Sequence, residues 1–184
     1  MAITRITSPA ITSVSSTSIS GTLPAANIND TSIGNITALP AGVGGKVLQI
    51  VQASTSTYAE SSSNTYADTG LSVTITPTST SNKIYIVGTQ ADCFKSNGNS
   101  SNSIHLRLLR DTTEILYIAD RALLTVTTIE NMNNIGFNYL DTPSTTSAIT
   151  YKTQFHNHTS VNRVTVQQQN DGTSTITAME IAGW

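Results

Sequence analysis

Short stretches in which apolar and polar residues alternate are the feature that most limits how this chain can fold. In residues 71–76, "LSVTIT", every second residue is apolar. A period of two places one kind of side chain on each face of a β-strand, whereas an amphipathic helix requires a period near 3.6. No stretch of the sequence keeps the helical period for more than about one turn. The chain is therefore predicted to be all-β.

Turn-forming sequences recur along most of the chain. The stretch "TPTSTSN" separates residues 71–76 from a longer apolar stretch that starts at Lys83, and this arrangement predicts a hairpin. Residues 104–119 predict a second hairpin, with its turn at 111–113. Turns spaced by about 8–12 residues, with about eight to ten short strands between them, are typical of sandwiches and barrels. The predicted fold is a jelly-roll-like antiparallel β-sandwich.

Residues 1–45 differ in composition from residues 46–184. Only Arg5 and Asp30 are charged in the first segment, and its isoleucines and leucines are scattered singly. Such a segment cannot bury enough apolar surface on its own to offset the entropy of ordering it. It is either a disordered tail or, as we favour, an extended docking arm that a glycine hinge joins to the sandwich domain. The residues expected to anchor the arm in a partner's groove are Ile11, Ile19, Leu23, Ile28, Ile33, Ile36 and Leu39.

Few side chains in this protein carry a charge. Asp, Glu, Lys and Arg make up 11% of the residues, and the net charge is −2. Nucleic-acid binding requires clustered Lys and Arg, so a dedicated nucleic-acid-binding protein is not expected. Membrane insertion is not expected, because the sequence has no apolar run of about 18 residues. The N-terminus lacks the apolar core of a signal peptide, which predicts that the chain is made in the cytoplasm.

The sequence contains no motif that indicates catalysis. Its acidic residues are scattered, so a possible pair such as Asp92 and Asp120 carries little information. There is no glycine-rich phosphate loop, no G-x-S-x-G and no C-x-x-C. Cys93 is the only cysteine, which excludes an internal disulfide, and it is predicted to be a small buried side chain. We therefore expect that the protein is not an enzyme.

Three stretches of the sequence resemble a family of bacteriophage virion proteins that occurs among tail-fibre-like and capsid-decoration proteins. These stretches are "GGKVLQIVQAST", "TYADTGLSVTITPTSTSNKIYIVG" and "STITAMEIAG", and the match covers residues 43–183. The stretch "ISGTLPAANINDTSIGNITALPAG" in the arm resembles, more weakly, N-terminal segments of phage structural proteins. The resemblance implies a β-sandwich domain that is usually trimeric and has a structural or binding role without enzymatic activity. It transfers no catalytic or binding residues to this chain.

His156 and His158 are the one pair of residues with metal-binding potential that the sequence singles out. On a strand, residues i and i+2 face the same side, so both imidazoles can address one point. Two histidines are too few for a closed metal site, but three copies near the axis of a homotrimer would offer six nitrogens. Some trimeric phage fibres hold an iron ion in this way. The alternative is a polar loop at the end of a strand. His105 is expected on the surface, and no other cofactor is expected.

Two structural functions follow from the resemblance and the composition. In the first, the protein is a capsid decoration (cement) protein, with its arm on the major capsid protein and an outer trimeric knob. In the second, it is a small tail-fibre or receptor-binding protein, with its arm on a tail protein and its loops against host-surface glycans. The short chain favours the first, because a fibre must span a distance and this sequence has no long repetitive shaft. The expected location is the virion in both cases.

Overall fold

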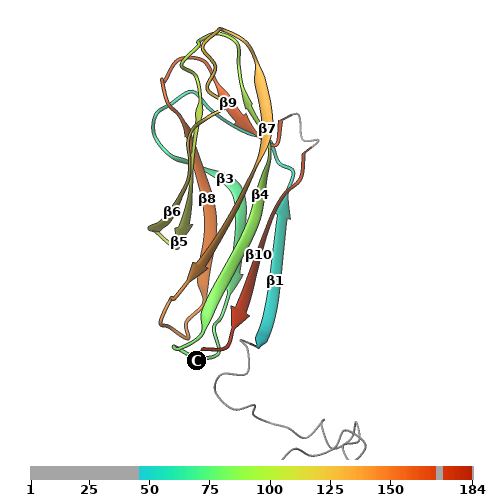
Figure 1. The fold of residues 1–184 in the computed structure, drawn as a ribbon, viewed down its shortest axis with the longest axis vertical. Helices are drawn as coiled ribbons and strands as arrows, with labels where there is room; N and C mark the ends of the chain where they lie inside the picture. The colour runs from blue at the N-terminus through green and yellow to red at the C-terminus, as the bar shows by residue number, and fades with distance from the viewer. Residues whose placement is uncertain (1–45, 169–171, 184) are drawn as a thin grey trace, which may run out of the picture. The chain divides into compact units, whose positions relative to one another are not determined.

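The described residues of the computed structural model, 46–168 and 172–183, form ten β-strands and no α-helix (Figure 1). The predicted arm and all its anchor residues lie outside this part of the chain. The all-β prediction is confirmed, and so is the expected number of strands. The strands are β1 (Val47–Thr55), β2 (Ala59–Ser61), β3 (Ala67–Ile75), β4 (Lys83–Lys95), β5 (Ile104–Arg110), β6 (Thr113–Ala122), β7 (Asn131–Asp141), β8 (Ile149–Asn157), β9 (Val164–Val166) and β10 (Ser174–Ile181).

The strands form two antiparallel sheets. One sheet has the order β1-β10-β4-β9-β2, with β7 also paired to β4, and the other has the order β3-β8-β5-β6. Apart from the short strands β2 and β9, the pairs are nested: β1 with β10, β3 with β8, β4 with β7, and β5 with β6. This is the pairing of one long hairpin that is rolled into two sheets, which defines a jelly roll. The predicted jelly-roll-like sandwich is confirmed.

One of the two predicted hairpins is wrong. β3 pairs with β8, whereas β4 pairs with β10 and β7 in the other sheet, so residues 76–82 cross from sheet to sheet. The buried carboxylate of Glu180 holds this connection, because it accepts hydrogen bonds from Thr78 N and Asn82 Nδ2, both at 2.6 Å. Alternation predicted the two strands correctly, but their partners come from distant parts of the sequence. The second predicted hairpin, β5–β6, is confirmed.

Two irregularities interrupt the pairing of the strands, and the second also changes which way side chains point. Gly70 was expected to end a turn, but it lies inside β3 at a shift in the pairing with β8, with a φ of +85° that suits glycine. A second shift lies in β4 between Gln90 and Cys93, where Asp92 has a φ of +43°. Beyond this bulge, Cys93 faces the core although Gln90 also does, so inward positions change from even to odd numbers. A bulge re-aims side chains in this way.

The core between the sheets consists of two hydrophobic clusters. The larger cluster lies toward the start of β1 and comprises Leu71, Val73, Ile75, Ile84, Ile86, Leu108, Phe137, Ile149, Tyr151, Ile176 and Ala178. The smaller comprises Cys93, Ile104, Leu106, Phe155, Val164 and Val166. Cys93 is completely buried there, as predicted, and burial raises the pKa of its thiol to about 12. The described residues contain no helix that is long and apolar enough to cross a membrane.

A layer of buried polar side chains separates the two clusters and joins the sheets. Thr69 of β3 contacts the Thr153 hydroxyl of β8 at 2.5 Å, and Thr153 donates to Gln90 Oε1 of β4 at 3.0 Å. Gln90 Nε2 in turn donates to Ser174 Oγ of β10 at 2.9 Å. All four side chains are inaccessible to solvent. A buried polar group without a partner costs about 1–3 kcal/mol, so this layer stabilises the sandwich only as a complete set.

Candidate functional site

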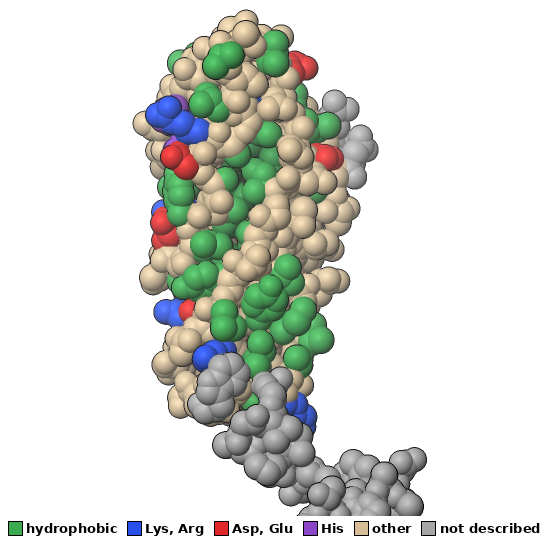
Figure 2. Space-filling model, in the orientation of Figure 1, with side chains coloured by type: hydrophobic (Ala, Val, Ile, Leu, Met, Phe, Trp, Pro, Cys, Tyr) green, Lys and Arg blue, Asp and Glu red, His purple; other side chains and the backbone are tan. Residues whose placement is uncertain are grey.

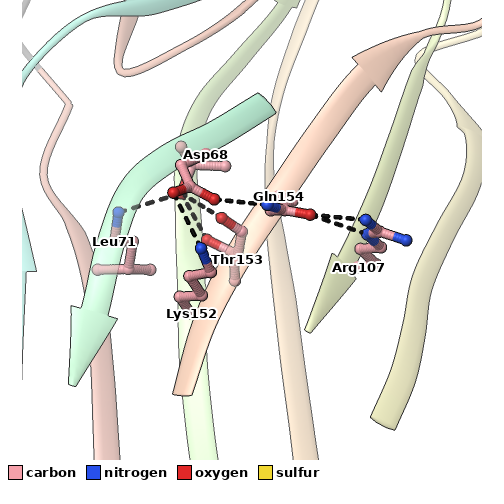
Figure 3. Close-up of polar contacts among 7 residues, drawn as sticks. Asp68, Leu71, Arg107, Lys152, Thr153 and Gln154 are labelled. Carbon is pink, nitrogen blue, oxygen red and sulfur yellow. Dashed lines mark hydrogen bonds and ion pairs between the residues drawn. The ribbon is translucent and has the colours of Figure 1, made fainter. Parts of the chain in front are cut away.

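The outer surface of the four-stranded sheet carries a continuous ladder of polar contacts, and we call this surface the polar face. Asp68 of β3 lies 3.0 Å from Lys152 Nζ and accepts a 2.6 Å hydrogen bond from Gln154, both of β8 (Figure 3). Gln154 Oε1 accepts from Arg107 Nη2 of β5 at 2.7 Å. Arg107 Nη1 lies 3.0 Å from Glu114 Oε2 of β6. The ladder therefore crosses all four strands.

The charged groups of this ladder satisfy one another. The Arg107 guanidinium also lies over the Tyr66 ring, with its carbon 3.6 Å from the ring centroid. Partial burial raises the pKa of Asp68, but hydrogen bonds from Gln154 and Lys152 outweigh it and hold the pKa below its ordinary value. The Asp68 carboxylate thus stays ionised against a cation and an amide. The ladder therefore does not leave Asp68 poised as a general acid or base.

The three histidines of the chain gather at one end of the polar face. The rings of His105 and His156 are stacked, with centroids 4.3 Å apart, and His105 Nε2 lies 3.1 Å from His158 Nδ1. His105 Nδ1 contacts the Tyr117 hydroxyl and lies 3.4 Å from Asp120 Oδ1. Burial lowers the pKa of His105, and the neighbouring His156 lowers it further, against the raising effect of Asp120. The cluster thus favours a neutral His105.

The histidine cluster changes one expectation from the sequence and leaves a second one untested. His105 was expected on the surface, but it is buried and links His156 to His158. The register explains this, because β5 lies beside β8 and pairs His105 with His156. In the described part of one chain, no three His, Cys, Asp or Glu side chains are arranged to hold a metal ion. The predicted iron site at His156 and His158 needs three chains and stays a prediction.

The outer surface of the six-stranded sheet is different, and we call its part over β1, β10, β4 and β7 the apolar face. The register aligns Ile50, Met179, Tyr85 and Leu140 in one row across these four strands. Two further rows follow toward the far end of the sheet. They consist of Gln52, Thr177, Val87 and Asn138, and then of Ser54, Thr175, Thr89 and Gly136. None of the side chains in these three rows is charged.

Large apolar side chains on this face are exposed to solvent. Ile50 is 62% exposed, Leu140 46% and Val87 36%, and Val47 and Leu48 at the start of β1 add to them. Figure 2 shows hydrophobic side chains gathered over β4, β10 and β1, toward the end of the molecule where β1 begins. Soluble monomers rarely expose contiguous apolar patches larger than a few hundred Å². The apolar face is therefore the candidate functional site.

The sequence contains a signal for this face. Most strands alternate, but β4 contains "IYIV", in which Ile84 and Ile86 face the core while Tyr85 and Val87 face outward. Strands that are covered on both faces read as nearly continuous apolar runs. The run predicted a strand, and its outward residues, Tyr85 and Val87, also indicate an apolar outer face. The pairing that brings Leu140 beside Tyr85 could not have been read from one sequence.

A second feature lies at the far end of the six-stranded sheet. It is a cleft of about 450 Å³ whose rim carries both charges and amides. Arg163 at this cleft lies 3.6 Å from Glu60 Oε2 of β2. The residues that line the cleft are Phe94, Glu130, Asn131, Met132, Arg163 and Gln168.

No protein-family model matches this sequence, and no curated protein matches it. Among solved structures, the VP2 subviral particle of infectious bursal disease virus aligns with a TM-score of 0.42 and 13% identity, over 74% of this chain and 40% of that one. The T13 particle of the same virus aligns with a TM-score of 0.43 and 11% identity, over 73% of this chain and 38% of that one. This chain thus spans about two fifths of the viral chains that it resembles. A likeness of this size supports no inference about function.

Proposed function

We propose that this chain is a non-enzymatic structural protein of a bacteriophage virion, and more narrowly a capsid decoration protein. Residues 1–45 would dock on capsid subunits, and the jelly roll would form an outer knob as a homotrimer. The observation that carries the proposal is the apolar face, which begins at β1, the strand that directly follows residues 1–45. The resemblance of residues 43–183 to phage virion proteins supports it.

The two outer faces suit a part that is fixed on one side and exposed on the other. The apolar face and residues 1–45, of which only Arg5 and Asp30 are charged, both favour burial against a partner. The polar face, whose charges are paired among themselves, needs no partner. Assembly proteins require such a division of surfaces, whereas an enzyme requires convergent reactive groups in a cleft.

The copy number in purified virions tests this proposal. Quantitative mass spectrometry against the major capsid protein should find hundreds of copies in a simple ratio to that protein. In parallel, a variant that lacks residues 1–45 should fold and yet fail to join particles. Absence of the protein from purified virions, or normal incorporation without the arm, would refute the decoration proposal.

A small tail-fibre or receptor-binding protein is the second candidate. The observation that favours it is the apolar tip formed by the β6–β7 connection, where Leu124 is 45%, Val126 97% and Ile129 53% exposed. This connection lies near the Lys95 end of β4, far from the start of β1 at the Lys83 end (Figure 1). A few tens of copies per virion, in a multiple of three, and hits on a glycan array would favour this candidate over decoration.

The iron site remains part of the proposal for a trimer. It would use His156 and His158 from each of three chains, with imidazole as a ligand type that suits iron. Elemental analysis of the purified protein should then find about one iron per three chains. A metal-free preparation that is fully assembled would remove the iron site from the account.

A further inference from the structure

We propose that a second copy of this chain packs against the apolar face, sheet against sheet. The inference goes beyond the proposed function, because it names a contact between copies on the sheet opposite to the one that carries the histidines of the proposed iron site. It concerns the purified chain alone, so its failure would leave the virion location untouched, and the reverse also holds.

The first argument is the geometry of the face. Its central row, Ile50, Met179, Tyr85 and Leu140, lies on four neighbouring strands in register, so apolar side chains stand at the same height across the sheet. Sheets pack face to face at about 10 Å when their side chains interdigitate. A flat row of this kind fits another sheet better than it fits a single peptide or a small ligand.

The second argument is how little charge the face carries. On one side of the apolar row lie Gln52, Thr177 and Asn138, then serine, threonine and glycine, and on its other side lie Val47, Ile181 and Lys83. Burial of an unpaired charge would be costly, but the neutral side chains can be buried or form hydrogen bonds across an interface. Lys83 lies at the margin, where β4 begins, so the centre of the face can pack on a copy of itself without bringing like charges together. A face whose charges all had one sign would instead require a partner of opposite charge.

The third argument is the size of the face. Four strands at about 4.8 Å and the nine residues of β1 at about 3.3 Å give a footprint of about 19 by 30 Å, or about 570 Å². Standard interfaces bury about 800 Å² of accessible surface on each partner. Two such footprints together give about 1,140 Å², which exceeds the total of about 1,000 Å² expected of a biological interface. The face is therefore large enough for association between copies, and much larger than one exposed side chain.

The arrangement also has a consequence for residues 1–45. β1 is an edge strand of the six-stranded sheet and belongs to the apolar face. If copies pack through this face, their β1 strands lie close to the contact. Each assembly would then carry several copies of residues 1–45, and several linked arms bind a particle far more tightly than one arm does.

The test is the mass of the full chain in solution, measured by sedimentation equilibrium over a wide range of concentrations. We expect assemblies of two or more chains. Ile50→Lys and Leu140→Lys should each weaken association by at least about 100-fold, because each places a charge in the uncharged contact. Val126→Lys is the matched control, since it exchanges an even more exposed apolar residue outside the face and should not change the assembly.

Two results would overturn the proposal. One is a full chain that stays monomeric at every concentration. If removal of residues 1–45 then made the chain associate, the arm itself would be the occupant of the face. The other is an assembly that persists unchanged in both lysine variants while their circular dichroism and melting temperatures match those of the parent chain.

Discussion

The two outer faces of the sandwich are built on the same plan but have opposite chemistry. On the polar face, a ladder from Asp68 to Glu114 crosses four strands through hydrogen bonds and ion pairs. On the apolar face, a row from Ile50 to Leu140 also crosses four strands, and it carries no charge. Both sheets are covered by the same core on their inner sides. The outer side chains of one sheet therefore favour contact with water and those of the other favour burial, although both sheets cover the same core.

Hydrogen bonding within a face decides whether it needs a partner. The polar ladder satisfies its own donors and acceptors, so water can cover it at little cost. The apolar row gains about 25 cal/mol for each Å² that is removed from water, and among the described residues Ile50 and Leu140 of this row stay exposed. We therefore expect substitutions on the polar face to change stability, and substitutions on the apolar face to change assembly.

The largest expected effect lies beneath both faces, in the polar layer that joins the sheets. Gln90→Leu keeps a similar volume but removes the acceptor of Thr153 and a donor to Ser174. It should lower the free energy of unfolding by about 2–3 kcal/mol, measured by urea denaturation. Thr74→Val is the control, because it removes an exposed hydroxyl pair with Thr150 and should cost less than about 0.5 kcal/mol. Equal effects of the two substitutions would contradict the structural role of the layer.

The second-largest expected effect distinguishes the polar face from the apolar face. Arg107→Ala removes two hydrogen bonds to Gln154, the ion pair with Glu114 and the contact with the Tyr66 ring. Because the Arg107 side chain is only 24% exposed, we expect a loss of about 1–2 kcal/mol in chemical denaturation. The mass of the assembly in solution should not change. A loss of assembly in this variant would show that the polar face is also a contact surface.

The histidine cluster predicts a pH dependence that belongs to the polar face alone. Because the pKa of His105 is lower in the folded chain than in the unfolded chain, the unfolded chain binds more protons in acid. The contribution of neutral His105 to stability is thus complete above about pH 6.5, the ordinary pKa of histidine. It is lost as the pH falls toward the pKa that His105 has in the folded chain. Melting temperatures between pH 7.5 and 5 should fall less in His105→Gln than in the parent. Parallel curves would contradict this explanation.

The smallest effect is expected from the solvent-exposed end of the polar ladder. Lys152→Met removes the ion pair with Asp68, whose side chain is 54% exposed. Exposed pairs contribute about 0–1 kcal/mol, so we expect a loss below about 0.5 kcal/mol. Added salt should reduce even this difference in denaturation experiments, because it screens the pair. A large effect that resists salt would mean that this end of the ladder is buried in the assembly.

Local patterns predicted much of this architecture from the sequence. The alternation in residues 71–76 predicted part of β3, and the turn at 111–113 predicted the β5–β6 hairpin. These predictions succeed because strand character and short turns depend on neighbouring residues. The hairpin between β3 and β4 failed, since "TPTSTSN" has the composition of a turn whether the chain returns or crosses to the other sheet.

The candidate site was harder to predict because it depends on pairing across long sequence separations. Leu140 joins the apolar row only where β7 brings it beside Tyr85, and His105 joins His156 only where β5 lies next to β8. One sequence contains no information on such pairs. The bulge at Asp92, which re-aims the end of β4, likewise has no clear signal in "TQADCF".

Side-chain footprinting by mass spectrometry, at low and at high protein concentration, tests the central claim most directly. The probes are paired by chemistry: Tyr85 and Leu140 lie on the apolar face, whereas Tyr117 and Leu124 are exposed elsewhere. We predict that labelling of Tyr85 and Leu140 falls severalfold as the concentration rises, while labelling of Tyr117 and Leu124 stays constant. Labelling of the apolar face that is the same at both concentrations would contradict the claim that another copy covers it.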